Sequence, residues 1–158
     1  MKILIDNREQ KKLKFSHPYI TNVIYTTLPY GDYGCLYENG YKAPYVFEKK
    51  ALGDLYSSLS KGYTRLKRRM NQAIKDNVTF IIIIEASLTK INKGYKHSTR
   101  KPSEIIQQLF TLMVRHNIMF VCCKDAEEAS LFITNFFMAV GRERMRKIKE
   151  DKKKEKVN

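Results

Sequence analysis

The sequence is short of acidic residues and of long apolar runs, and each shortage excludes a class of protein. Only 16 Asp and Glu stand against 30 Lys and Arg, which gives a net charge of +14. A surplus this large favours a polyanionic partner, either nucleic acid or an anionic membrane surface. No apolar run approaches the roughly 20 residues that span a bilayer, and Asp6 interrupts the N-terminus where a signal peptide would stay apolar. We therefore expect an intracellular protein that binds nucleic acid and no membrane.

Cysteine is also scarce, and the three residues present form no metal or disulfide pattern. Cys122 and Cys123 are adjacent, so on a strand they face opposite ways and rarely pair with each other. The sequence has three histidines and no Cys-x-x-Cys pair, which leaves a zinc site without support. We expect Cys35 and the adjacent pair to be reduced core thiols.

The chain has no internal repeat and no Pro- or Gly-rich linker, and 158 residues fit one globular domain. A hydrophobic content of 43% is enough for one core, which excludes a wholly disordered chain. We assign residues 1–141 to this domain. Residues 142–158 hold nine basic and four acidic residues without a core pattern. They predict a basic helix extension that frays into a partly disordered tail.

Hydrophobic periodicity divides the domain into a β-rich first half and an alternation of helices and strands. Strands are predicted over residues 2–6, 23–28, 33–38, 44–48, 80–85 and 118–122. Helices are predicted over residues 52–74, with Gly62 as a point where the helix bends or breaks, from Ser103 as cap, and from Asp125 with Glu128 in a capping box. The order predicts an α/β fold, a mixed central sheet flanked by helices.

Several acids stand at the ends of apolar β segments, namely Asp6, Asp32, Glu48 and Glu85. In a sheet of neighbouring strands such ends can converge on one edge, where open α/β sheets commonly carry their sites. Close carboxylates repel each other, and a hard divalent cation relieves that repulsion. The sequence therefore predicts a metal-binding site at one edge of the sheet.

The triplet Glu48-Lys49-Lys50 adds a cation to this pattern. On an extended strand Glu48 and Lys50 are two residues apart and point to the same side. A carboxylate that holds a metal, beside an ammonium group that can orient or deprotonate water, suits phosphodiester hydrolysis. Each piece alone has an ordinary explanation, because acids also end strands for solubility and an E-x-K triplet occurs by chance in many proteins.

Three ordered motifs make the chain resemble the XPF-type structure-specific nuclease family. They are Asp6-Asn7-Arg8-Glu9, Leu28-Pro29-Tyr30-Gly31-Asp32-Tyr33 and Glu48-Lys49-Lys50-Ala51-Leu52-Gly53-Asp54, which match the family's D-x-R-E, L-x-x-G-D-Y and E-R-K-x-x-x-D. The similarity spans about residues 2–140. It implies a restriction-endonuclease-like core of the PD-(D/E)xK superfamily. It also implies a divalent-metal-dependent endodeoxyribonuclease that uses Mg²⁺ or Mn²⁺.

The resemblance further implies roles for individual residues. Asp32 and Glu48 are the expected central metal ligands, and Lys50 is the expected catalytic lysine. Asp6 is expected to complete the metal site or to hold a second cation. Asp54 either supports these ligands or is a helix N-terminal acid favoured by the helix dipole.

Arg8 and Glu9 belong to the same implied catalytic set, with two functions open. They either position water or phosphate, or they form a salt bridge that braces the strand end. Lys49 replaces the Arg of the family's E-R-K triplet and loses its planar bidentate fork. A phosphate or carboxylate clamp at this position is therefore expected to be looser.

Two further departures concern DNA recognition. Gly62-Tyr63-Thr64-Arg65 occurs where the family tends to show a Gly-Arg step, so Arg65 is expected to replace that arginine imperfectly. The tandem helix-hairpin-helix module of many relatives does not occur within these residues. Recognition of DNA shape is thus expected from this domain, its tail, a second copy or a partner.

Two runs of basic residues contain no acid, residues 61–75 and residues 87–101. A solvated helix face normally mixes charges, so acid-free runs favour a surface that contacts phosphates. An ordinary exposed face is the alternative for the first run. The second run is expected to be a loop that orders over the DNA backbone. The predicted DNA contacts are Lys61, Arg65, Arg68, Arg69, Lys93, Lys96, Arg100 and Lys101.

The leading hypothesis is an endonuclease that acts on branched, flapped or otherwise structured DNA. The alternatives are a catalytically inert DNA-binding subunit of a nuclease complex and a restriction- or recombination-type PD-(D/E)xK nuclease. Relatives dimerise through helices at the C-terminal end of the domain. A homodimer or heterodimer that buries part of Phe132, Phe136 and Phe137 is therefore expected as well.

Overall fold

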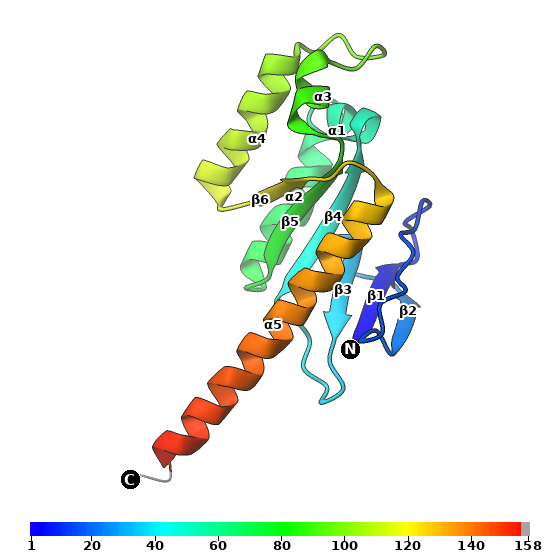
Figure 1. The fold of residues 1–158 in the computed structure, drawn as a ribbon. Helices are drawn as coiled ribbons and strands as arrows, with labels where there is room; N and C mark the ends of the chain where they lie inside the picture. The colour runs from blue at the N-terminus through cyan, green and yellow to red at the C-terminus, as the bar shows by residue number, and fades with distance from the viewer. Residues whose placement is uncertain (156–158) are drawn as a thin grey trace.

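The computed structural model describes residues 1–155 as one mixed β-sheet with helices on both faces (Figure 1). β3 runs antiparallel to its neighbours β1 and β4, and the other neighbouring pairs are parallel. The predicted α/β class with a mixed sheet is confirmed. The strands are β1 (Lys2–Asp6), β2 (Asn22–Thr26), β3 (Tyr33–Leu36), β4 (Tyr45–Ala51), β5 (Thr79–Glu85) and β6 (Met119–Cys122), in the spatial order β2-β1-β3-β4-β5-β6.

The direction of β3 decides which acids meet. Since β3 is antiparallel to β1 and β4, it begins at the edge of the sheet where those two strands end. Asp6 is the last residue of β1, and Asp32 comes directly before β3. The Asp6 N–H donates to the Asp32 carbonyl oxygen over 2.8 Å. Glu48 lies inside β4 rather than at its end, because the strand continues three residues further than predicted, to Ala51.

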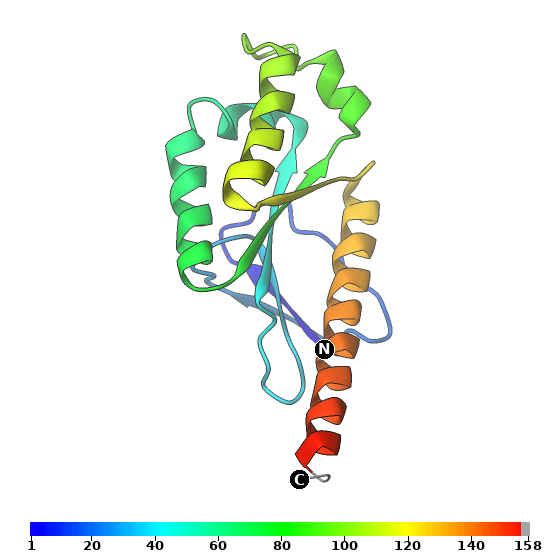
Figure 2. The ribbon, with the colours of Figure 1, turned by 90° about the vertical axis from the view of Figure 1, so that its left-hand side faces the viewer.

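The helices form two layers around the sheet. One layer packs its apolar side chains on Val46, Phe80, Ile82 and Ile84, and α5 packs on the opposite face (Figure 2). The first layer comprises α1 (Leu52–Ser58), α2 (Tyr63–Lys75), α3 (Leu88–Lys93) and α4 (Pro102–His116), and the second is α5 (Ala126–Glu155).

Strict alternation along β4 sends neighbouring side chains to different layers. Val46 belongs to the core under α1 and α2, and Phe47 belongs to the core under α5. By the same alternation Glu48 and Lys50 face the α1 and α2 side, and Lys49 faces the α5 side. The sheet thus separates the members of the Glu48-Lys49-Lys50 triplet.

The interruption predicted at Gly62 is confirmed, because two helices occur over the predicted range and the Gly62 N–H between them donates to the Ser57 carbonyl oxygen over 3.0 Å. Two other helix starts differ from the predictions. The run predicted as a loop from residue 87 begins with α3, whose first turn is capped by Ser87. Lys101, not Ser103, is the N-cap of α4, because Pro102 occupies the first helical position, where no N–H is needed.

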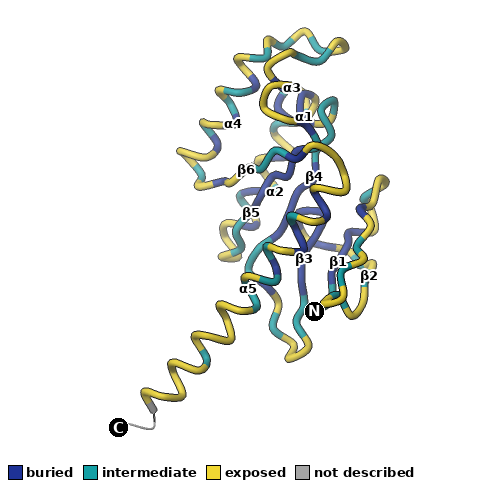
Figure 3. The backbone as a smooth tube through the Cα atoms, viewed as in Figure 1, coloured by how far each residue is buried: buried dark blue, intermediate teal, exposed yellow. Residues whose placement is uncertain are grey.

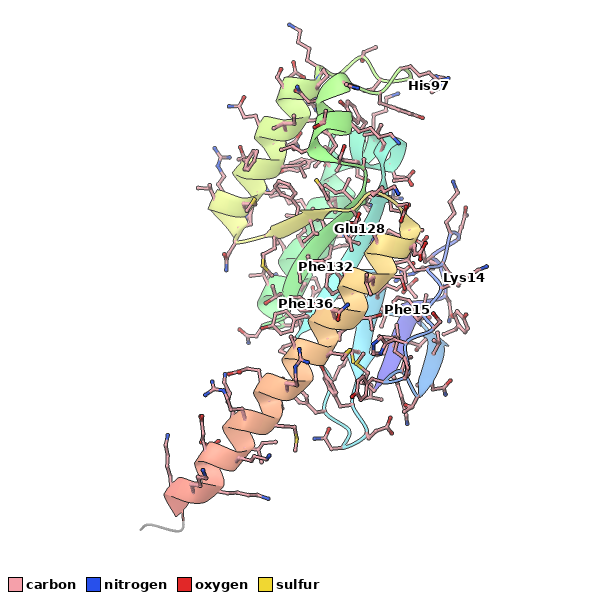
Figure 4. The ribbon with its side chains drawn as sticks, in the orientation of Figure 1. Lys14, Phe15, His97, Glu128, Phe132 and Phe136 are labelled. Atoms are coloured by element: carbon pink, nitrogen blue, oxygen red, sulfur yellow. The ribbon has the colours of Figure 1, made fainter. Side chains whose placement is uncertain are left out.

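The capping interaction predicted for the last helix is confirmed, since the Glu128 N–H donates to Asp125 Oδ1 over 2.9 Å. The segment before β2 packs against this helix through the Ser130 hydroxyl, which donates to the Lys14 carbonyl oxygen; Figure 4 shows Lys14 and Phe15 beside α5. Cys35 and the adjacent pair at 122 and 123 are free thiols, as expected.

The C-terminal turns of α5 extend beyond the sheet. The helix runs unbroken to Glu155, and most side chains of its last four turns are exposed (Figure 3). The division into a domain over residues 1–141 and a basic extension stays a prediction, and the tail residues 156–158 lie outside the described residues. No helix within residues 1–155 is long and apolar enough to cross a bilayer.

Candidate active site

Asp32 and Glu48 lie side by side because β3 and β4 pair antiparallel. The Asp32 N–H donates to the Phe47 carbonyl oxygen over 2.6 Å, and Asp32 Oδ2 accepts the Lys49 N–H over 2.7 Å. Gly31 makes this approach possible. Its φ of +70° suits glycine, and a Cβ there would lie 2.2 Å from Val46 Cγ2. The turn signature in the sequence therefore fixes the first carboxylate against the strand that carries the second.

Lys50 is the partner of Glu48 on the same side of β4. Its Nζ lies 2.7 Å from Glu48 Oε1, and the Glu48 side chain is only 1% exposed. The predicted orientation of these two residues agrees with the structure. The pair supplies a buried carboxylate and an ammonium group at one place on the sheet surface.

A third cation enters this site from helix α2. Arg69 Nη1 donates to Glu48 Oε1 over 2.8 Å, and Nη2 donates to the Gly31 carbonyl oxygen over 3.0 Å and to Asp32 Oδ1 over 3.4 Å. Arg69 is one of the predicted DNA contacts. The structure instead binds its guanidinium group to the carboxylate pair. The position signalled this, because Arg69 is three residues after Leu66 and adjacent to Met70, both buried against the sheet.

The electrostatics of the carboxylate pair are unusual at neutral pH. Burial and the neighbouring charge of Glu48 raise the pKa of Asp32 to about 7. The hydrogen bond from the Lys49 N–H and the charges of Arg69 and Lys50 oppose this rise. A proton thus competes for Asp32 with any cation that binds there.

The Asp6 carboxylate is held by hydrogen bonds from Arg8 of the same motif and from the Leu28 backbone. Its Oδ1 accepts the backbone N–H and the Nε–H of Arg8, and its Oδ2 accepts Arg8 Nη2 and the Leu28 N–H, all within 2.8 Å. Burial alone would raise the pKa of Asp6, but these hydrogen bonds outweigh it and lower the pKa to about 2. Of the two functions open for Arg8, the geometry favours a salt bridge that braces the end of β1.

Lys49 lies on the opposite side of the sheet from Glu48. Its Nζ is 3.4 Å from Glu9 Oε1 and 3.6 Å from Glu85 Oε1, and its side chain is 5% exposed. The period of two along β4 and β5 places Lys49 and Glu85 on this face. The Lys49 ammonium group therefore lies on the other face from that of Lys50, although the residue also lines the cleft described below, and its catalytic part stays a prediction. Glu9 thus forms a salt bridge, which is one of the two functions predicted for it.

One cavity of about 490 Å³ connects these groups to solvent. Asp54, exposed in the first turn of α1, lines it together with Gln72 of α2. All eight sequence-predicted catalytic residues thus line a single cleft. The charged lining residues are Asp6, Arg8, Glu9, Asp32, Glu48, Lys49, Lys50, Asp54, Arg65, Arg68 and Arg69.

The donor set of this cleft fits a hard divalent cation. Within residues 1–155, nothing donates a hydrogen bond to Oε2 of Glu48, although this oxygen is buried. No cluster of three or more acidic, His or Cys ligands occurs in the described residues. Mg²⁺ keeps several waters and is commonly bound by one or two carboxylates together with substrate phosphates. Asp32 and Glu48 provide that number.

Apart from Arg69, the predicted DNA contacts divide into three groups. Arg65 and Arg68 are exposed and line the cleft. Arg100 is bound to the protein itself, since its guanidinium group donates to the Leu59 carbonyl oxygen over 3.0 Å and to Glu104 over 2.7 Å. The remaining predicted contacts are exposed and lie outside the cleft lining, namely Lys61, Lys93, Lys96 and Lys101.

The loop between α3 and α4 and the aromatic residues of α5 do not line the cleft. His97 is exposed on the loop between α3 and α4 (Figure 4) and packs edge-on against Tyr95. The aromatic residues of α5 serve the core of their own chain: Phe136 packs on Tyr45 with ring centroids 5.1 Å apart, and Phe137 is fully buried.

Comparison with known proteins agrees with this architecture. The chain matches the ERCC4 domain over residues 5–136, so it belongs to the ERCC4 domain family. The predicted XPF-type resemblance is thereby confirmed. Among solved structures the chain is similar to XPF from Aeropyrum pernix, with a TM-score of 0.62 and 20% identity over 85% of this chain and 63% of that chain.

A second similar structure is XPF from Aeropyrum pernix in complex with DNA, with a TM-score of 0.65 and 20% identity over 89% of this chain and 65% of that chain. The chain spans less than two thirds of the length of either XPF chain. No match occurs among curated protein sequences. At this identity the likeness supports the fold, and the chemistry depends on the residues of the cleft.

The raised pKa of Asp32 predicts that the carboxylate pair destabilises the metal-free fold. A folded-state pKa above the unfolded value gives stability that is present below about pH 4 and lost as the pH rises through about 7. In EDTA, Asp32→Asn is therefore expected to unfold at a higher urea concentration than the wild type. The gain at pH 8 is expected to be about 1–3 kcal/mol, because the amide removes the charge but also one acceptor.

At pH 5 the stability gained by Asp32→Asn over the wild type should be smaller than at pH 8, because Asp32 is then mostly protonated in the folded wild type. Urea unfolding monitored by circular dichroism measures both values. A gain that does not change with pH would contradict the shifted titration of Asp32.

Proposed function

We propose that the protein is a divalent-metal-dependent endonuclease that hydrolyses phosphodiester bonds in branched or otherwise structured DNA. The observation that carries this proposal is the cleft in which Asp32, Glu48 and Lys50 meet at the junction of β3 and β4. Membership of the ERCC4 domain family supports the same reaction class. The proposal includes an intracellular, DNA-processing role in repair or recombination.

Asp32 and Glu48 would hold Mg²⁺ or Mn²⁺, since both carry oxygen donors that are buried at the base of the cleft. When bound, the cation supplies Lewis acidity and positive charge against the charge that develops on the phosphate. The Lys50 ammonium group can donate hydrogen bonds to the attacking water and to a nonbridging phosphate oxygen. Water attacks phosphorus and loses a proton to solvent, the P–O bond to one sugar breaks, and the leaving oxygen takes up a proton, so the products are a phosphomonoester and a sugar hydroxyl.

Asp6 has a different part in this proposal from the one implied by the family resemblance. Both of its oxygens already accept hydrogen bonds from Arg8 and the Leu28 backbone. We therefore assign it to hold the end of β1 beside Asp32 rather than to bind the cation. The exposed Asp54 carboxylate lines the cleft and can accept hydrogen bonds from water molecules that surround the cation.

The exposed basic side chains are proposed to bind the DNA backbone. Arg65 and Arg68 stand on α2 beside the cleft, and Lys93 and Lys96 stand on α3 and the loop that follows it. If about six phosphates are contacted, log affinity should fall with log salt concentration at a slope near −5. Fluorescence anisotropy at several salt concentrations measures the slope. The double variant Arg65→Gln, Arg68→Gln should flatten it by about two, whereas a slope near zero in the wild type would contradict a phosphate track.

A substrate panel tests the proposed reaction. We expect faster cleavage of labelled flap, fork or four-way DNA than of plain duplex or single strands of the same sequence, with Mg²⁺ or Mn²⁺ present. Equal cleavage of plain duplex would favour a restriction- or recombination-type nuclease. Binding of all substrates without cleavage of any would favour the inert subunit.

The inert DNA-binding subunit is the second candidate function, and one observation favours it. Arg69 and Lys50 already neutralise the carboxylates to which a cation would bind. The presence of the full Asp32, Glu48 and Lys50 set favours the active enzyme over this candidate.

A dimer remains part of the proposal, as a homodimer or as a heterodimer with a related chain. The aromatic face of α5 is largely used within the chain, so a dimer formed through this helix would use its exposed residues, such as Leu131. Light scattering at high protein concentration that gives only the monomer mass would exclude the homodimer.

A further inference from the structure

We infer that Arg69 is an internal counter-ion of the metal site, which holds the carboxylate pair in the metal-free protein and leaves it when cation and DNA bind. The inference rests on the proposed function, because it assigns a role at the same site. It goes beyond that function by making one arginine compete with the metal and respond to the substrate. Arg69 is a positioning residue in this account, not a catalytic one.

The first support is the set of atoms that Arg69 occupies. Its two terminal nitrogens reach both carboxylates and a backbone oxygen, over 2.8 Å to Glu48 Oε1, 3.4 Å to Asp32 Oδ1 and 3.0 Å to the Gly31 carbonyl. A planar guanidinium fork can span acceptors on two strands at once, which a single ammonium group cannot do. A cation that bridges the two carboxylates would meet Arg69 at Asp32 Oδ1 and beside Glu48, whose Oε2 accepts no hydrogen bond from residues 1–155.

The second support is charge. The carboxylates of Asp32 and Glu48 carry two negative charges when ionised, and Lys50 and Arg69 carry two positive charges against them. A divalent cation added to this set would meet two cations at close range. Withdrawal of Arg69 restores the balance, whereas Lys50 is expected to stay for its part in the chemistry.

The third support is the route by which Arg69 can leave. Its side chain is 25% exposed, compared with 1% for Glu48, and it lines the open cleft together with the exposed Arg68. The Arg69 guanidinium group is therefore at the solvent side of the pair. A DNA phosphate in the cleft offers it an alternative acceptor of the same geometry.

This arrangement couples metal binding to DNA binding. A phosphate that draws Arg69 from the carboxylates should raise the affinity for the cation, and by linkage the cation should raise the affinity for DNA by the same factor. Without DNA, Arg69 keeps the affinity of the site for the cation low.

Arg69→Gln tests the competition directly, with Lys67→Gln as the matched control, because Lys67 is an exposed cation of the same helix outside the cleft lining. Mn²⁺ binding to the full chain without DNA is measured from the electron paramagnetic resonance signal of free Mn²⁺. We expect Arg69→Gln to bind Mn²⁺ about tenfold more tightly than the wild type, and Lys67→Gln to bind within about twofold of it. Arg69→Lys should fall between, because one ammonium group still reaches Glu48.

A second readout guards against a simple loss of folding. In EDTA, Arg69→Gln should melt below the wild type, because the carboxylates lose their counter-ion, and Mn²⁺ should raise its melting temperature more than that of the wild type. Wild-type or weaker Mn²⁺ affinity in Arg69→Gln would overturn the inference.

The failure of the underlying function gives a different result. If the wild type and Glu48→Gln bind Mn²⁺ equally weakly, the metal site itself is absent and both proposals fail. If the wild type binds Mn²⁺ through Glu48 while Arg69→Gln shows no gain, only the role of Arg69 is overturned.

Discussion

Replacement of Glu48 by Gln is expected to lower the rate of DNA cleavage by at least about 10³-fold. Glu48 is the most buried acid of the cleft, with 1% of its side chain exposed, and it contacts both Lys50 and Arg69. The amide removes the negative charge that a cation needs and presents an NH₂ group or a neutral oxygen to two cationic side chains. Single-turnover cleavage at saturating protein measures the rate without a contribution from product release.

DNA binding by Glu48→Gln should stay within about twofold of the wild type, because the change removes a negative charge and no phosphate contact. Glu85→Gln is the matched control. Glu85 lies on the adjacent strand but on the opposite face, where it is paired with Lys49. Its loss should leave the cleavage rate within a few-fold. Equal loss of cleavage in both variants would contradict the assignment of the site to the α1 and α2 face.

The second large effect is expected on stability. Asp6→Ala should destabilise the fold by about 2–4 kcal/mol. The change removes the acceptor of the buried Leu28 N–H and three hydrogen bonds from Arg8. Urea unfolding at pH 7 measures the loss. The exposed acid Asp54 is the control, since Asp54→Ala should change stability by no more than about 0.5 kcal/mol.

The pH dependence of the free energy of unfolding shows whether the ionised Asp6 carboxylate provides this stability. A pKa lowered to about 2 means that the Asp6 contribution is present above about pH 4 and is lost as the pH falls through 2. The difference between wild type and Asp6→Ala should hence be constant from pH 5 to 8. A difference that grows across this range would contradict the assignment of Asp6 as a fully ionised brace.

Local sequence patterns predicted the approximate positions of the strands and the meeting of Asp32, Glu48 and Lys50 at one site. The period of two placed Glu48 and Lys50 on one side of a strand, and the Gly31 turn placed Asp32 at the start of the next paired segment. The same period, followed one residue further, would have placed Lys49 on the other face. The motif resemblance grouped it with the catalytic residues because a motif records sequence order and not direction.

Long-range packing decided what local patterns could not. Arg69 and Arg100 both belong to acid-free basic runs, and both were predicted to contact DNA. The register of α2 on the sheet brings Arg69 to the carboxylates, and the fold of the loop after α3 brings Arg100 to the Leu59 carbonyl oxygen. Spacing along α2 places Arg69 near the buried side of the helix, but it does not say which acceptors Arg69 or Arg100 meets, because each contact joins elements separated by tens of residues.

The most direct test of the central claim is restoration of cleavage by metal. The protein is stripped of cations with EDTA, mixed with the preferred labelled substrate, and assayed before and after excess Mg²⁺ or Mn²⁺ is added. The account predicts no cleavage before addition, cleavage after it, and none at either stage for Asp32→Asn. Wild-type cleavage that persists in EDTA, or binding of DNA without cleavage in either metal, would contradict it.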